Sequence, residues 1–224
     1  RTNISQTREF LIIFLHFSPS FLPKQLNLPS VLGLFQLFIK AANKHIFLQG
    51  CNLTVHRISQ RFYPFDLTTS DLSGTGAMAA LYEKIHKAVK SFPETFRNNI
   101  TIVIDDISIM EVAANGCSSS VLHFIHYCYT LTSEFGCTLL LLNHEDIYDE
   151  MDNPTLHCQL KLLADIVIKV KPLSTGFASD VHGQISALNK GFIGRNGAVE
   201  IKVDNFQFMV KENNVEYFYP GTRA

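Results

Sequence analysis

Short apolar runs alternate with amphipathic helical patterns along most of this chain, and this alternation restricts the fold more than any other feature. The runs with strand character are Glu9–Phe17, His45–Gln49, Ile100–Asp105, Thr138–Asn143 and Ile166–Lys171. Apolar residues at helical spacing mark 77–92 and about 118–135, where Ser118 to Ser120 can cap the start and Gly136 suits the end. We therefore predict an α/β fold with a mostly parallel sheet flanked by helices.

The pattern changes after Asp180, where short strands separated by turns follow one another. The segments VHGQISAL, AVEIKV, FQFMV and VEYFY read as strands, and Asn213-Asn214 is typical of a hairpin turn. We expect these strands to extend the sheet in antiparallel fashion. The chain has 224 residues, 46% of them hydrophobic, which suits one continuous core and a single domain over 1–224.

The amino-acid composition limits which partners the chain can bind and in which cellular compartment we expect it. The net charge is −1 and only 17% of residues are charged, so the chain would need a partner or a local patch to hold nucleic acid. Its five cysteines are odd in number and form no C-x-x-C, which favours reduced thiols inside a cell. We expect the cytoplasm, with the nucleus as a second location. The apolar run over 10–17 is too short to span a bilayer, so no membrane partner is predicted.

Two aspartates directly follow the apolar strand in the stretch NITIVIDDISIM, from Asn99 to Met110. At the carboxyl end of a central strand, Asp105 or Asp106 would lie where open α/β sheets bind ligands, and a Walker-B acid binds magnesium there. Acids also end buried strands because they begin the next turn, and both interpretations stay open. The polar stretch Asn143 to Glu145 has the same two readings, a ligand sensor or ordinary loop residues.

The phosphate-binding loop that should accompany a Walker-B acid has no match. The nearest spacing is Ser18 to Gln25, where Ser18 and Pro23 stand at the two glycine positions. Proline has no N–H to donate, and Gln25 replaces the hydroxyl that would bind magnesium. Gly74-Thr-Gly76 resembles a dinucleotide fingerprint but follows a polar stretch instead of a strand. We predict no nucleotide cofactor.

Motifs for metal and hydrolase chemistry are also incomplete. His123 and His126 share a helix face, but Cys128 points elsewhere and no complementary ligand cluster is visible. A nucleophile elbow would need glycine at the position of Ser120. We therefore predict no metal and no catalytic residue.

Two segments resemble the Elongator complex protein 6 family: VLHFIHYC at 121–128 and STGFASDVHGQISAL at 174–188. The resemblance extends over about 33–219. It implies a RecA-like fold in a six-membered ring, with two copies each of Elongator proteins 4, 5 and 6. It also implies that the ring binds tRNA, is linked to ATP turnover and supports modification of wobble uridines at carbon 5. In this family Asp105 and Asp106 would be a relic of a nucleotide site on a non-catalytic subunit.

Two other functions stay open. One is an ATPase subunit that binds nucleotide through Asp105 and Asp106, with the phosphate cradle supplied by a neighbouring subunit. The other is a generic α/β scaffold that is unconnected with RNA.

Candidate contact residues follow from their positions. Phe124 and Tyr127 lie off the apolar stripe of their helix, so we expect them to face outward and to form a subunit interface. Lys190, Arg195 and Lys202 lie near the antiparallel loops and are candidates for RNA contact.

The start of the chain is expected to be shorter than in the family and to lack the first strand. If Glu9–Phe17 is the family's second strand, the central place beside Ile100–Asp105 is empty, and the chain alone should be insoluble or molten. Alternatively, Glu9–Phe17 itself occupies the central place, with 18–25 as a degenerate loop behind it.

Overall fold

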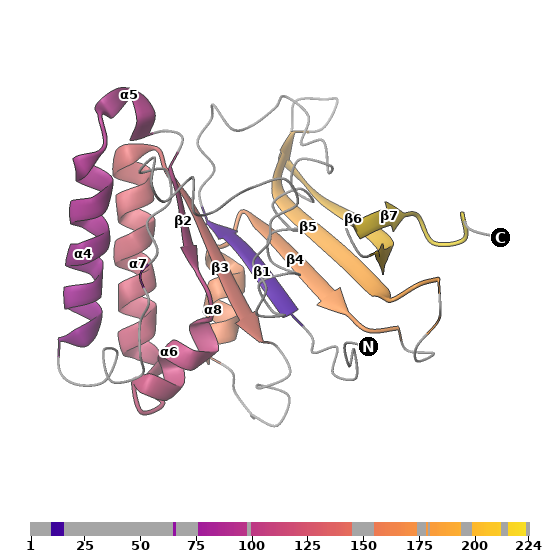
Figure 1. Cartoon of the computed structure of the whole chain (residues 1–224), viewed down its shortest axis with the longest axis horizontal. Coiled ribbons are helices and arrows are strands. Elements are labelled where there is room, and N and C mark those ends of the chain that lie inside the picture. Colours follow the sequence, from indigo (N-terminus) through magenta and orange to yellow (C-terminus); the bar gives the residue numbers. More distant parts are fainter. Residues whose placement is uncertain are drawn as a thin grey trace.

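A computed structural model describes residues 10–15, 65, 76–97, 100–144, 155–173, 178, 180–193, 199–211 and 215–222. One seven-stranded sheet runs through these residues, with helices packed against one of its faces (Figure 1). The strands are β1 (Phe10–Leu15), β2 (Thr101–Ile104), β3 (Thr138–His144), β4 (Ile166–Lys171), β5 (Gly183–Ile193), β6 (Val199–Val210) and β7 (Val215–Phe218). The helices are α4 (Ala77–Ser91), α5 (Glu94–Arg97), α6 (Ile107–Ala113), α7 (Ser118–Phe135) and α8 (Thr155–Leu163). The expected strand His45–Gln49 lies outside these ranges.

The strand order is β2-β3-β1-β4-β5-β6-β7, and most neighbouring strands run antiparallel. Only β2 and β3 pair in parallel, whereas the pairs from β3–β1 through β6–β7 are antiparallel. The α/β class and the antiparallel C-terminal strands are confirmed, but the prediction of a mostly parallel sheet is wrong. The physical reason is that apolar periodicity identifies a strand and contains no information about its direction.

Strand β1 lies inside the sheet between β3 and β4, but not in the place beside β2 that the second of our two alternatives gave it. Its Ile12 lies opposite Leu142 of β3 on one side and Ile168 of β4 on the other. The neighbour that both alternatives assumed is wrong, because β2 pairs with β3 and not with β1. Along the described chain, no strand pairs with the other edge of β2. The segment 18–25 lies outside the described residues.

Strand β3 is buried on both of its faces, which explains its continuous apolar sequence TLLLLNH. Leu139 and Leu141 point toward the helices and belong to the main core cluster. Leu140 and Leu142 alternate to the opposite face and are equally buried.

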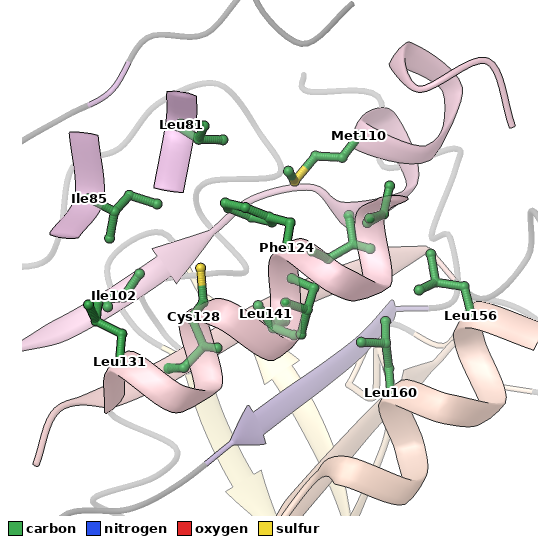
Figure 2. Close-up of a cluster of buried hydrophobic side chains, with 14 of the residues drawn as sticks. Leu81, Ile85, Ile102, Met110, Phe124, Cys128, Leu131, Leu141, Leu156 and Leu160 are labelled. Carbon is green, nitrogen blue, oxygen red and sulfur yellow. The ribbon is translucent and has the colours of Figure 1, made fainter. Parts of the chain in front are cut away.

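Helix α7 buries a wider face than one stripe, because it packs against α4 and α8 as well as β3. The prediction that Phe124 faces outward is therefore wrong. Its side chain is 2% exposed and lies with Leu81 and Ile85 of α4 and with Met110 of α6 (Figure 2). The remaining buried residues of α7 are Val121, Ile125, Cys128, Leu131 and Thr132.

The predicted end of α7 at Gly136 is confirmed, but the predicted cap at its start is not. Gly136 ends the helix with φ of 70°, and its N–H donates to the Thr132 carbonyl, as expected. The start is different, because Cys117 is the capping residue and makes no side-chain cap hydrogen bond. The Ser118 hydroxyl donates to the Glu111 carboxylate instead. The three serines lie inside the first turn and not at the capping position before it, so the predicted serine cap is wrong.

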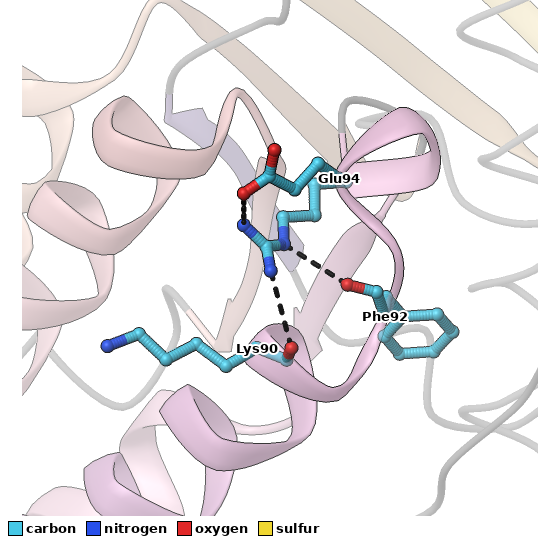
Figure 3. A network of polar contacts seen from close by, with 4 residues as sticks. Lys90, Phe92 and Glu94 are labelled. Atoms are coloured by element: carbon cyan, nitrogen blue, oxygen red, sulfur yellow. Dashed lines mark hydrogen bonds and ion pairs between the residues drawn. The ribbon is translucent and has the colours of Figure 1, made fainter.

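Arg97 joins the end of α4, the short helix α5 and the end of α7. Its Nε donates to the Phe92 carbonyl at 3.2 Å and its Nη2 to the Lys90 carbonyl at 3.4 Å (Figure 3). Its Nη1 contacts Glu94 at 3.3 Å, and the guanidinium lies 5.2 Å from the ring centre of Phe135. Carbonyls at a helix end lack partners within the helix, so this side chain stabilises the end of α4.

The antiparallel half has one crowded position at the start of β5. A Cβ atom at Gly183 would lie 2.6 Å from the Lys171 carbonyl oxygen and 2.6 Å from the Phe208 ring, so only glycine fits without movement. The predicted turn at 213–214 lies outside the described residues, although the flanking Val210 and Val215 pair as a hairpin requires. Among the helices that the structure describes, none is both long and apolar enough to cross a membrane.

Candidate functional site at the ends of β2 and β3

Asp106 uses both carboxylate oxygens to join α6 to the sheet. It is the N-cap of α6, where its Oδ1 accepts the Ser108 backbone N–H at 2.9 Å and also the Ser108 hydroxyl. Its Oδ2 lies 3.0 Å from Nε2 of His144, the last residue of β3. A side-chain oxygen at the N-cap satisfies a backbone N–H that has no partner within the helix. The second aspartate of the pair therefore has a structural role that explains its presence.

Asp105 differs from its neighbour because it is exposed. The peptide bond between the two aspartates is cis. Partial desolvation raises the pKa of the Asp105 carboxyl, the adjacent Asp106 carboxylate raises it further, and His144 opposes them. Asp105 is thus the more exposed member of the pair, although its carboxyl is partly desolvated.

Asn143 and His144 are part of β3, so the interpretation as ordinary loop residues is wrong for both. Successive side chains of a strand point to opposite faces, which separates Asn143 from the His144–Asp106 contact. Asn143 is wholly buried, and within the described part of the chain neither of its amide atoms has a hydrogen-bond partner. Sequence reasoning grouped these residues with Asp105 but missed the burial of the amide. Glu145 lies outside the described residues.

The carboxylate of Asp106 could bind a metal ion only by giving up a contact within the protein. Both oxygens of Asp106 already have partners within the protein. Across the described residues, no group of three or more histidine, cysteine, aspartate or glutamate side chains could hold a metal ion. On α7, His123 and His126 are exposed whereas Cys128 is buried, so these three do not converge.

Of the two interface candidates, only Tyr127 lies at the surface. Its side chain is 60% exposed, and its ring centre lies 5.5 Å from that of Tyr82 on α4. Tyr82 in turn stacks on His86 with ring centres 5.7 Å apart. Tyr127, Tyr82 and His86 thus form an aromatic row where α4 packs on α7, and Phe124 does not belong to this row.

The RNA-contact candidates have different surroundings. The Lys190 ammonium donates to the carbonyls of Lys161 and of Leu162, the latter at 3.2 Å, near the end of α8. Lys202 lies on β6, where its ammonium is 3.0 Å from the Asp204 carboxylate. Arg195 lies outside the described residues. Lys190 therefore stabilises the end of α8, a role that sequence reasoning did not foresee.

Cys117 is a reactive thiol that the sequence reasoning passed over. It is exposed at the start of α7, with its sulfur 3.3 Å from the Ser119 hydroxyl and 3.0 Å from that of Ser120. These hydrogen bonds lower its pKa to about 7. The signal in the sequence was a cysteine followed by three serines at the start of a helix.

The chain is similar to known proteins of one family. The family model described as Elongation complex protein 6 matches residues 25–212. The chain is 26% identical to Elongator complex protein 6 of Homo sapiens over 199 residues, which cover 85% of this chain and 73% of the human protein.

Two further relatives have the same name. The Mus musculus protein is 28% identical over 182 residues, covering 79% of this chain and 67% of the mouse protein. The Xenopus laevis protein is 29% identical over 130 residues, covering 55% of this chain and 46% of the frog protein.

Proposed function

Because the chain belongs to the Elongation complex protein 6 family, we propose that it is a non-catalytic subunit of the Elongator complex. The observation that carries this proposal is the match of the family model over residues 25–212, which includes most of the described sheet and its helices. The relatives from human and mouse are named as members of the same complex.

In this proposal the chain has a RecA-like fold and assembles with Elongator proteins 4 and 5 into a hexameric ring. The ring binds tRNA and supports modification of wobble uridines at carbon 5, in the cytoplasm and also the nucleus. The exposed Tyr127 is the remaining candidate for contact with a neighbouring subunit, since aromatic side chains are enriched at protein interfaces.

The arrangement of the paired aspartates supports an architectural subunit. Asp106 caps α6 and contacts His144, so its removal would affect the packing of α6 against β3. An acid with both oxygens occupied by the protein is poorly available to a metal ion and its phosphate ligands.

The exposure of Asp105 favours a second candidate function. In that case the chain contributes Asp105 to a nucleotide site shared with a neighbouring subunit, which supplies the phosphate-binding loop. Asp105→Asn in the assembled ring would then lower nucleotide binding, whereas the architectural proposal expects unchanged binding.

Binding of tRNA should depend on the assembly. A chain with a net charge of −1 offers little attraction to phosphates, so the ring should bind tRNA more tightly than the isolated chain does. Among the candidates, Lys202 is the first to test, because its side chain is 46% exposed, whereas the Lys190 ammonium donates to backbone carbonyls at the end of α8. Lys202→Ala should weaken tRNA binding by the ring and reduce its salt dependence, while Lys87→Ala on α4 serves as the control.

Complementation tests the function directly. Cells that lack their own Elongator complex protein 6 would receive the tagged chain, and wobble-uridine modification would be measured by mass spectrometry of tRNA. We expect restored modification and co-purification of Elongator proteins 4 and 5. Co-purification without restored modification would contradict the functional part alone, and loss of both would contradict the whole proposal.

A further inference from the structure

Within the described part of the chain, no strand pairs with the outer edge of β6 over much of its length. β6 spans Val199–Val210, but β7 pairs only with Gln207–Val210 at one end (Figure 1). Along 199–206 the described chain pairs β6 with β5 alone. An open edge offers a row of backbone donors and acceptors to another strand.

The residues that face this edge can be assigned from one hydrogen bond. The Phe208 carbonyl accepts the His182 backbone N–H at 2.8 Å, on the side of β5. Backbone groups of alternate residues in a strand point to opposite sides, so those of Ile201, Val203 and Asn205 face the open edge. The side chains of Ile201 and Val203 are 69% and 55% exposed, which leaves two large apolar groups beside unpaired backbone.

The sequence along this edge is complementary to itself. Residues 199–203 read V-E-I-K-V. If two copies pair in antiparallel fashion about Ile201, each Ile201 lies opposite Ile201 of the other copy, and each Glu200 lies opposite Lys202. Charged residues on an edge strand normally oppose pairing, but in this register each charge meets its opposite.

Other registers fit less well. A pairing centred on residue 200 or 202 would place Glu200 opposite Glu200 or Lys202 opposite Lys202. A pairing centred on Val203 keeps an opposite-charge match, Lys202 with Asp204, but places Ile201 opposite the polar Asn205. The contact of Lys202 with Asp204 within the chain does not prevent the cross-strand pair, because an exposed ammonium can contact two carboxylates.

We propose that the open edge of β6 is a docking surface for the same edge of a second copy of this chain, in an antiparallel register centred on Ile201. The two sheets then form one continuous sheet across two chains. This surface is on a different strand from the aromatic row of α4 and α7 that contains Tyr127. The inference does not rest on the proposed function.

Charge reversal tests the pairing with the full-length chain in solution. Sedimentation over a range of concentrations should show a dimer, and Glu200→Lys or Lys202→Glu alone should raise its dissociation constant at least about tenfold. An equimolar mixture of the two variants should restore dimers, as should the double variant, because opposite charges face each other again. Lys87→Glu on α4 is the matched control and should change nothing.

Several outcomes would overturn the proposal. These are a wild-type chain that stays monomeric at all concentrations, a dimer that tolerates either single reversal, and a mixture that fails to re-associate. Circular dichroism tests whether each variant is folded. If a single variant is unfolded, the double variant still tests the pairing, because it should form dimers.

Cysteine cross-linking tests the register in a chain with Cys117→Ser and Cys158→Ser, because both of those thiols are exposed. Opposed residues of a hydrogen-bonded pair have Cα atoms about 5.5 Å apart, a distance that a disulfide can span. Ile201→Cys should therefore give a linked dimer on mild oxidation, and Val203→Cys should not. The reverse result would overturn the register, and a link from Ile201→Cys to a different protein in a cell extract would overturn self-pairing.

Discussion

At the helix-covered end of the sheet, polar and apolar side chains contact one another within the chain, whereas apolar side chains at the open edge of β6 remain exposed. At the ends of β2 and β3, Asp106, Ser108 and His144 satisfy one another, and the apolar side chains of α7 are buried. Along β6, Ile201 and Val203 remain exposed beside backbone that no described strand pairs with on its outer side. The first region stabilises the fold through contacts within the chain, whereas the second leaves its contacts available to another molecule. Substitutions should therefore affect stability at the first region and association at the second.

The largest effect should come from the buried face of α7. Phe124→Ala should lower the free energy of unfolding by about 3–5 kcal/mol, because it leaves a cavity between α4, α6 and α7. Tyr127→Ala on the same helix is the matched control and should cost under about 1 kcal/mol. Denaturant unfolding of the two variants measures both values, and equal losses would contradict the assignment of Phe124 to the core.

A change in the opposite direction should come from Asn143. Replacing it by leucine, of similar size, removes a buried amide without hydrogen-bond partners and should raise the free energy of unfolding by about 1–3 kcal/mol. The same variant should be tested for wobble-uridine modification in cells. A stabilised chain that no longer supports modification would show that the amide is retained for function, and a destabilised one would show that it has a partner in solution.

The capping aspartate should have a smaller effect. Asp106→Ala removes the N-cap of α6 and the contact with His144, and should cost about 1–2 kcal/mol. Protection of α6 amides from hydrogen exchange should fall more than protection of α4 amides. A uniform loss across both helices would indicate that the aspartate acts on the whole domain instead of on α6.

Asp105→Asn should have a small and pH-dependent effect of the opposite sign. The folded state raises the pKa of Asp105 above its unfolded value, so ionisation of this carboxyl opposes folding. The penalty is absent below the unfolded pKa, near pH 3.9, and grows as the pH rises through the folded pKa. The variant should therefore be slightly more stable than the parent at pH 7 and equal to it near pH 3, as unfolding at both values would show.

The smallest effect on stability is expected at the open edge. Ile201→Thr and Val203→Thr should change the free energy of unfolding by no more than about 0.5 kcal/mol when the chain is monomeric. Both variants should nevertheless weaken dimer formation in sedimentation experiments. A large loss of stability in the monomer would mean that these side chains contact the rest of the chain.

Local patterns were enough to locate most elements from the sequence. The predicted helix over 77–92 corresponds to Ala77–Ser91, and the predicted strand Ile166–Lys171 has the same bounds in the structure. Apolar spacing records which residues of an element face the core, and that property needs only neighbouring positions. The direction of β1 and the burial of Phe124 depend instead on contacts with distant elements, which spacing along one element does not report.

The candidate site was predicted in position but not in chemistry. Asp105 and Asp106 follow β2 as expected, but β2 lies at the edge of the described sheet and not at its centre. The capping role of Asp106 had a visible signal, since an aspartate before an apolar helical run is typical of an N-cap. Its contact with His144 had none, because it joins residues whose distance in space depends on the parallel pairing of β2 with β3.

The position of β1 also sets the order of events during synthesis. Its residues leave the ribosome before those of its neighbours, because Phe10 pairs with His144, about 130 residues later in the chain. At typical translation rates that delay is on the order of ten seconds, during which β1 has neither of its neighbours. Contacts between such distant segments also slow folding, because a long loop must close first. Nascent β1 therefore needs chaperone protection while β3 and β4 are being made.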